Sequence, residues 1–238
     1  GSNCLPRVIT TVCGLKPTRA QGEKTCPFDL CFSLDFDEIL NLLDSKFKNF
    51  YENVKLDKVE NEGIKSELNS IYGTKLISQI WHNPKSKIVF IHENDASPKS
   101  FVDRYDNRIK NLYDYIKDKN KRLYFVISTF KSLSDDQIKR LNSIVRHYRT
   151  GDFYNIIINQ SSENMEIHFD NTFVINYNKP NWLRLYKSGW VEMLKNHEKY
   201  KDADDFYNHI TDNLEKIILH ETVKRDNFLS KLRKILSL

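Results

Sequence analysis

The chain of 238 residues is long enough to bury a substantial core, and its hydrophobic fraction of 39% favours a folded protein over a disordered one. Its net charge is only +5, because 37 basic residues are offset by 32 interspersed acidic residues. This mixture lacks the one-sided basic surface that is typical of nucleic-acid binding proteins, and no apolar run approaches the ~20 residues of a membrane span. We therefore expect no nucleic-acid partner and no transmembrane segment.

Periodicity predicts a helix in the opening stretch "CLPRVITTV", where Leu5, Ile9 and Val12 share one face and a glycine follows as a stop. The β-branched "VITTV" leaves a strand as the alternative. If the helix is correct, Cys4 lies at its N-terminus, where N–H groups and the helix dipole lower the pKa of a thiol. Cys4 is therefore a candidate nucleophile, and a small buried hydrophobic residue is the alternative interpretation.

All four cysteines lie in the first 31 residues, and their spacing does not resemble that of paired Cys-x-x-Cys zinc ligands. Two disulfides would leave most of the chain without a crosslink, unlike a disulfide-stabilised scaffold. We therefore expect free thiols, a cytoplasmic location, and neither a metal nor another cofactor. Cys13, Cys26 and Cys31 are interpreted as core residues.

Alternating helices and strands are predicted along the middle of the chain. This order indicates βαβ units and an α/β fold, with a central, partly parallel sheet of about four to six strands flanked by helices. In chain order, we predict a helix over 36–50 capped by Asp35, a loop with helical turns over 52–75, a strand over 87–92, a helix that starts within "DASPKS", a strand over 122–130, a helix capped by Ser134 or Asp135, and a strand over 153–159.

The last third of the chain has a different character. Residues 165–178 alternate, and are predicted to form a hairpin or edge strands around the Asp170–Asn171 turn. Beyond residue 180 the pattern is helical, so we divide the chain into an α/β catalytic domain, 1–180, and a C-terminal helical extension, 181–238, packed on the same domain. Its apolar stripe is expected to close the core, and a membrane-surface or partner-binding helix is the alternative. The stripe comprises Leu214, Ile217, Ile218, Val223, Phe228, Leu232, Ile235 and Leu236.

Four short motifs, in this order and spacing, resemble those of the papain-like cysteine peptidase family DUF1796. They are a Gly-x-x-Cys start ending at Cys4, a Pro-Phe-Asp motif at 27–29, a histidine at a strand end, His92, and an Arg-Tyr…Arg-Ile helix at 104–109. The resemblance covers roughly residues 1–130. One departure is Leu30, which replaces the Trp that follows Pro-Phe-Asp in the family.

The resemblance implies a papain-like arrangement in which Cys4 attacks an acyl group, assisted by a histidine base and an orienting carboxylate. Hydrolysis and acyl transfer both fit this chemistry. The resemblance also implies a link to bacterial surface-polysaccharide metabolism, with a small-molecule, glycan or peptide substrate and neighbouring domains beyond this sequence. The alternative is a non-catalytic α/β domain of a larger glycan-biosynthesis or effector protein that mediates binding.

Three histidines compete for the role of base. His92 ends a predicted strand and opens a polar loop, a position where α/β folds display catalytic groups, so it is the first candidate. His82 and His168 are the alternatives, whereas the four histidines on predicted helices are interpreted as solvated. For the orienting carboxylate, Asp29 carries the family motif and Asp95 is the other candidate. A capping or turn-forming role is the alternative for Asp29.

Substrate-binding residues are predicted at two places. Asn3 adjoins the candidate nucleophile. Trp182 and Arg184 lie in "YNKPNWLRLYKSGW", a composition suited to stacking a sugar or contacting an anionic group. The alternative is that the tryptophans of this segment pack a helix onto the core.

Overall fold

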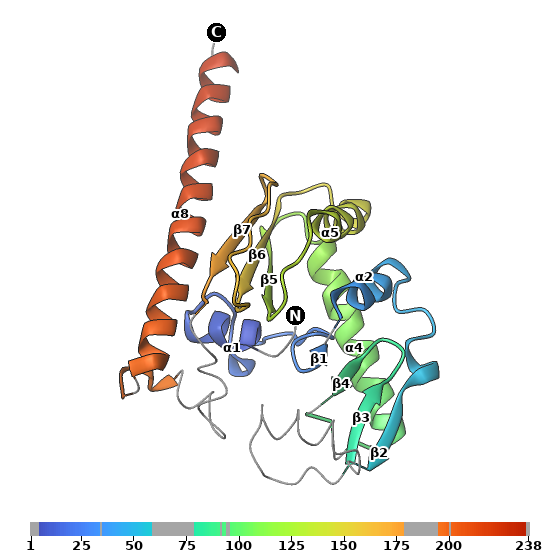
Figure 1. Cartoon of the computed structure of the whole chain (residues 1–238). Helices are drawn as coiled ribbons and strands as arrows, with labels where there is room; N and C mark the ends of the chain where they lie inside the picture. Colours follow the sequence, from blue (N-terminus) through green and yellow to red (C-terminus); the bar gives the residue numbers. More distant parts are fainter. Residues whose placement is uncertain are drawn as a thin grey trace.

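The computed structural model describes residues 5–33, 35–58, 79–90, 92–93, 96–178, 195–199 and 201–236. It is a mixed α/β protein with two separate sheets (Figure 1). The larger sheet is antiparallel, in the order β1 (Phe32–Ser33), β4 (Ile88–Phe90), β3 (Gln79–Asn83), β2 (Lys55–Lys58). The other is parallel, in the order β5 (Leu123–Thr129), β6 (Phe153–Asn159), β7 (Thr172–Asn176).

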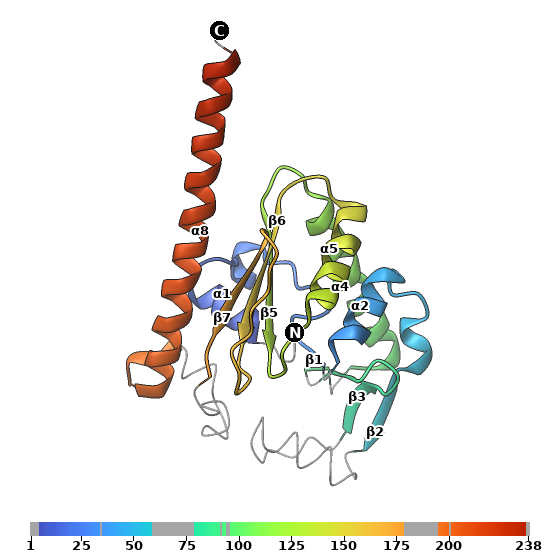
Figure 2. The ribbon, with the colours of Figure 1, turned by 45° about the horizontal axis from the view of Figure 1, so that its top comes forward.

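Helices cover both faces of the parallel sheet (Figure 2). On one side lie α1 (Leu5–Val12) and α8 (Lys201–Leu236), and on the other lie α4 (Pro98–Lys117) and α5 (Asp135–Tyr148). Helix α2 (Phe36–Asp44) packs against α5. Three short 3₁₀ helices complete the described elements: η1 (Arg19–Gln21), η2 (Phe50–Asn53) and η3 (His197–Lys199).

The alternation of side chains along β6 creates two cores. Phe153 and Ile157 belong to a core shared with α2, α4, α5 and the antiparallel sheet. Ile156 and Ile158 face the other way, into a core that includes Leu5 of α1 and residues of α8. Because both faces of β6 are buried, its sequence "FYNIIIN" is almost continuously apolar, as is usual for strands of parallel sheets.

Several predicted elements are confirmed, together with the residues that start them. Helix α1 forms as predicted and ends before Gly14, which adopts a φ of 71°. The Asp35 side chain caps α2 by accepting a hydrogen bond from the backbone N–H of Asp37. Ser134, rather than Asp135, caps α5 and forms a capping box with Gln137. Strands β5 and β6 lie within the predicted ranges.

The prediction of one central sheet is wrong, because β4 pairs with β1 and β3 instead of joining β5. The strand–helix–strand order suggested a parallel crossover, but β3 and β4 form a hairpin whose turn includes Lys87 at a φ of 51°. Strand β2 lies in the stretch predicted to be a loop, since "KLDK" is polar and gives little strand signal. The rest of that stretch, from residue 59 to residue 75, lies outside the described residues.

Two further boundaries differ from the predictions. Helix α2 ends at Asp44 rather than continuing to residue 50, because Lys46, Phe47 and Asn49 adopt left-handed backbone angles, and Phe47 is still buried. The predicted hairpin over 165–178 is wrong. This stretch contains a single strand, β7, which pairs parallel to β6 at the edge of the sheet. An edge strand was the alternative prediction.

The C-terminal helix packs through its first half. Ala203, Phe206, Ile210 and Leu214 are buried in the core shared with α1, whereas Leu219 is 63% exposed. Beyond this point α8 projects past the sheet (Figure 1), and the side chains from residue 220 onward, including Val223 and the rest of the predicted stripe, lie outside the described residues. None of the described helices is long and apolar enough to cross a membrane.

Candidate functional site

The first turn of α1 is fixed in place by burial on the parallel sheet. Leu5 and Ile9 are fully buried against β6 and α8, which anchors the helix along its apolar face. Asn3 and Cys4 directly precede this turn in the sequence and lie outside the described residues. Asp95, Trp182 and Arg184 also lie outside them. The roles of these five residues remain predictions.

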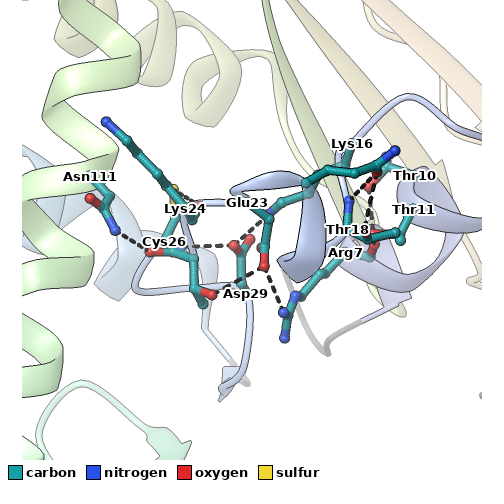
Figure 3. A network of polar contacts seen from close by, with 12 residues as sticks. Arg7, Thr10, Thr11, Lys16, Thr18, Glu23, Lys24, Cys26, Asp29 and Asn111 are labelled. Atoms are coloured by element: carbon teal, nitrogen blue, oxygen red, sulfur yellow. Dashed lines mark hydrogen bonds and ion pairs between the residues drawn. The ribbon is translucent and has the colours of Figure 1, made fainter.

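A chain of ion pairs joins α1 to the loop that follows it (Figure 3). The Arg7 guanidinium lies 2.9 Å from a carboxylate oxygen of Glu23. The Lys16 ammonium lies 3.2 Å from Glu23 and 2.6 Å from Asp29. Burial alone would raise the pKa of Glu23, but its contacts with Arg7 and Lys16 outweigh burial and hold the pKa below the usual value. Glu23 is therefore a buried anion that connects two cations.

Asp29 is part of this network. One of its carboxylate oxygens accepts hydrogen bonds from Lys16 Nζ at 2.6 Å and from the backbone N–H of Cys26 at 2.8 Å. The second bond closes the turn in which the N–H of Asp29 itself donates to the carbonyl of Cys26. Among the described residues, no hydrogen bond of the carboxylate reaches His92. The contacts therefore fit the turn-forming interpretation of Asp29.

His92 lies in the turn that follows β4, on the surface of the molecule. Partial removal of the imidazole from solvent lowers its pKa below the ordinary value, and the positive charge of Arg7 lowers the pKa further. The Glu93 carboxylate opposes these effects by raising the pKa, and Arg108 adds to them. The charge of Arg7, in the first turn of α1, is therefore one of the influences on the pKa of His92.

Glu93 is a residue of this region that sequence reasoning missed. Its side chain is 1% exposed and lies between two arginines of α4, with Arg104 at 2.8 Å and Arg108 at 2.6 Å. The signal was present in the sequence as two arginines four residues apart, which share one helix face. Nothing in the sequence alone identified the carboxylate that they face.

The other candidate bases are placed elsewhere. His82 lies on β3 and contacts Asp57 of β2 at 2.6 Å. His168 is 77% exposed and lies 3.9 Å from Asp135 at the start of α5. Among the helical histidines, His197 contacts Asp204 at 2.6 Å, and His209 donates a hydrogen bond to the carbonyl of Asn176. The pKa of His92, in contrast, responds to the charge of Arg7 on α1.

The described cysteines have the properties of packing residues. Cys31 is buried in the larger core, as predicted. Cys13 and Cys26 are half-buried, and none of the three described cysteines is joined in a disulfide. Burial raises the pKa of Cys13 to about 11 and that of Cys26 to about 12, so both remain protonated at neutral pH. A protonated thiol is a poor nucleophile, which argues against a catalytic role for these two cysteines.

A cavity of about 450 Å³ lies beside the first turns of α1. Pro6, Arg7 and Thr10 form its α1 wall, and residues 122–127 bring the length of β5 to another wall. Apolar side chains of α2 and α4 line the interior, while Lys16 and Asp29 contribute polar groups. The cavity therefore combines an apolar interior with a few charged groups, as binding pockets commonly do. Within the part of the chain that the structure describes, no cluster of metal-ligating side chains is present.

Comparison with known proteins agrees with this arrangement of motifs. The family described as "Putative papain-like cysteine peptidase (DUF1796)" matches residues 1–163, and the chain belongs to this family. The matched region includes Cys4, Asp29, His92 and the arginines of α4. The comparisons with curated proteins and with solved structures gave no match. Membership of this family suggests a cysteine-based hydrolytic function.

Proposed function

We propose that the protein is a papain-like thiol enzyme that hydrolyses or transfers an acyl group, with Cys4 as nucleophile and His92 as base. One observation supports this pairing above all: the positive charge of Arg7 is among the causes that lower the pKa of His92. Arg7 lies in the first turn of α1, and that turn directly follows Cys4 in the sequence. The family match supplies the independent reason to expect a cysteine and a histidine to act together.

In the proposed reaction, His92 removes the proton of the Cys4 thiol, and the sulfur attacks the carbonyl carbon of the substrate. The new sulfur–carbon bond pushes electrons onto the carbonyl oxygen. When the carbonyl re-forms, the bond to the leaving group breaks, and the imidazolium returns the proton to that group. Water then cleaves the thioester in a hydrolase, whereas a hydroxyl of an acceptor such as a sugar cleaves it in a transferase.

The start of α1 offers groups that suit this reaction. Backbone N–H groups in the first turn of a helix point toward its N-terminus, and that of Arg7 is one of them, whereas Pro6 has none to offer. Such groups stabilise a negative charge on the substrate oxygen. The lowered pKa keeps His92 neutral at pH 7, which is the form that accepts a proton.

The cavity beside α1 suits the acyl part of the substrate. Its α1 wall begins two residues after Cys4, and its interior is mostly apolar. A substrate whose acyl portion carries apolar groups, such as a peptide with apolar side chains, fits this composition. The peptide is the substrate class that the family suggests, and we keep the polysaccharide-linked acyl transfer within the proposal, with Asn3, Trp182 and Arg184 as its further substrate contacts.

For Asp29, the contacts support a positioning role within the proposal. The carboxylate holds Lys16 and the turn at Cys26, and Lys16 in turn reaches Glu23 and thereby Arg7. Loss of Asp29 would therefore loosen the loop that braces the first turn of α1.

The division of the chain into 1–180 and 181–238 also belongs to the proposal. The core that α1 and α8 share supports the view that both parts form one structural unit.

The first prediction tests the nucleophile by iodoacetamide alkylation, with each cysteine followed separately by peptide mass spectrometry. At pH 7 we expect Cys4 to react at least tenfold faster than Cys13 and Cys26, whose raised pKa values keep them protonated. Cys4→Ser should abolish hydrolysis of acyl substrates and leave the melting temperature nearly unchanged. Cys13→Ser is the matched control and should retain activity. Equal reactivity of the cysteines would favour the non-catalytic binding domain.

A further inference from the structure

The turn that carries His92 is anchored at Glu93 by charge. The Glu93 side chain is almost completely buried, and its two oxygens face different arginines: Oε2 lies 2.8 Å from Arg104 and Oε1 lies 2.6 Å from Arg108. The two arginines stand four residues apart on one face of α4, so the carboxylate bridges successive turns of the helix. A buried carboxylate is costly unless it is paired in this way, and each partner therefore matters.

Backbone hydrogen bonds fix the same turn. The N–H of Glu93 donates to the carbonyl of Phe90 at 3.2 Å, and the N–H of Ala96 donates to the carbonyl of Glu93 at 2.9 Å. The indole N–H of Trp81, on the neighbouring strand β3, donates to the carbonyl of Ala96 at 3.3 Å. Glu93 is thus held through its side chain by α4 and through its backbone by the end of β4.

The helix that holds Glu93 is itself firmly packed. Trp81 stacks on Phe101, whose ring stacks in turn on Tyr105, with centroid distances of 4.8 Å and 4.7 Å. The Arg108 guanidinium lies over the Tyr105 ring, 4.7 Å from its centroid. This column of rings joins the antiparallel sheet to α4. The antiparallel sheet and α4, which hold Glu93 from two sides, are therefore packed against each other through these rings.

We propose that Glu93 is a positioning residue: clamped by Arg104 and Arg108, it sets the place of the adjacent His92 imidazole opposite the start of α1. This inference rests on the proposed function for the role of His92, but not for the clamp itself. It explains why an Arg-x-x-x-Arg pair lies on α4, far from the cysteine in sequence. The arginines act through Glu93, and Glu93 acts through His92.

The charges around His92 come from three elements: Arg7 on α1, Glu93 in its own turn, and Arg108 on α4. Glu93→Gln removes the one negative charge of this set and keeps the shape of the side chain. It therefore leaves His92 among positive charges, which disfavour the imidazolium. It also weakens the clamp, because a neutral amide holds a guanidinium less strongly than a carboxylate does.

The test is a pH titration of the His92 ring protons by NMR in the full chain, with the His92 signal assigned from its loss in His92→Gln. We expect Glu93→Gln to shift the His92 midpoint to lower pH and to broaden its signal. Asp106→Asn is the matched control, because Asp106 lies on the same helix and pairs with Tyr51. It should leave the His92 midpoint in place. An unchanged midpoint and line width in Glu93→Gln would overturn the proposal.

A second variant separates position from charge. Arg104 holds Glu93 but is not among the charges that shift the pKa of His92. We therefore expect Arg104→Gln to slow alkylation of Cys4 about tenfold at pH 7 through misplacement of the imidazole, with little change in the His92 midpoint. Because Arg104 is partly exposed and Arg108 remains, this variant also serves if Glu93→Gln does not fold. Wild-type alkylation rates together with a sharp His92 signal in Arg104→Gln would overturn the clamp.

The two proposals fail in different ways. If Cys4 of the unsubstituted chain shows no enhanced reactivity, the thiol mechanism is wrong, and the NMR titration still decides whether Glu93 places His92. If Cys4 is reactive but the titration is insensitive to Glu93, the mechanism stands and the clamp is merely structural.

Discussion

At the scale of single residues, Arg7 joins two parts of the site. Its guanidinium pairs with Glu23, and its positive charge also lowers the pKa of the His92 imidazole. No sequence pattern singles out this arginine, since a cation on the polar face of a short helix is ordinarily solvated. It stands out because its charge influences His92, which lies 85 positions later in the chain.

We predict that Arg7→Gln raises the pKa of His92. A nearby positive charge disfavours the imidazolium, so its removal lets the ring hold its proton to higher pH. The acid limb of Cys4 alkylation or of hydrolysis should then move to higher pH, with the plateau above it retained. The measurement is the pH profile of either rate. Arg140→Gln, on α5 and paired with Asn41 and Asp44, is the control that should not move it. A shift to lower pH in Arg7→Gln would contradict the placement of His92.

At the scale of elements, Arg149 connects the end of α4 with the loops that lead into β5 and β6. This fully buried residue follows α5, and its guanidinium donates to the backbone carbonyls of Ile116, Asp118, Lys121 and Asp152. These carbonyls belong to the end of α4, the loop before β5 and the loop before β6. A single side chain thus satisfies backbone groups that would otherwise be buried without partners.

Arg149→Met should therefore destabilise the fold more than a substitution of the neighbouring surface residue Arg146 does. Several buried carbonyls lose a charged donor, and we expect a loss of about 3 kcal/mol in the free energy of unfolding. For a chain of this size, that loss lowers the melting temperature by about 10 °C. Arg146→Met is the matched control, because Arg146 is exposed and its guanidinium lies over the face of the Phe153 ring. Equal melting temperatures for the two variants would refute the role of Arg149.

The elements also show what sequence could and could not predict. Helices with local signals were predicted well: Asp35 and Ser134 each cap the helix that follows within three residues. The antiparallel sheet was not, because β2 and β3 are held by pairing with each other rather than by apolar pattern. In the candidate site, the motif placed His92 at a strand end, but the partner of Glu93 depends on contacts between β4 and α4. Such contacts are set by tertiary packing, which local periodicity does not record.

At the scale of the whole molecule, α8 divides into a packed half and a projecting half. Leu214 is buried and Ile217 is half-buried, whereas Leu219 is largely exposed. A chain ending at Asp212 should lose about 3 kcal/mol in its free energy of unfolding, because it lacks the buried Leu214 and the half-buried Ile217. A chain ending after Leu219 keeps them and should melt close to the full chain. Thermal melts of the two truncated chains measure this difference. A large drop in the melting temperature of the chain that ends after Leu219 would show that the projecting half of α8 also stabilises the fold.

The core between α1 and α8 determines when α1 can pack during synthesis of the chain. Leu5 and Ile9 leave the ribosome well before Ile156, Phe206 and Leu214, with which they share a core. During synthesis the apolar face of α1 therefore cannot be buried before β6 has emerged, and its burial is complete only when the first half of α8 has followed. Contacts of such long range form late in folding. The segment that carries the proposed nucleophile is therefore made before the elements that hold it, so the newborn chain carries no fully packed cysteine–histidine pair until the first half of α8 has been made.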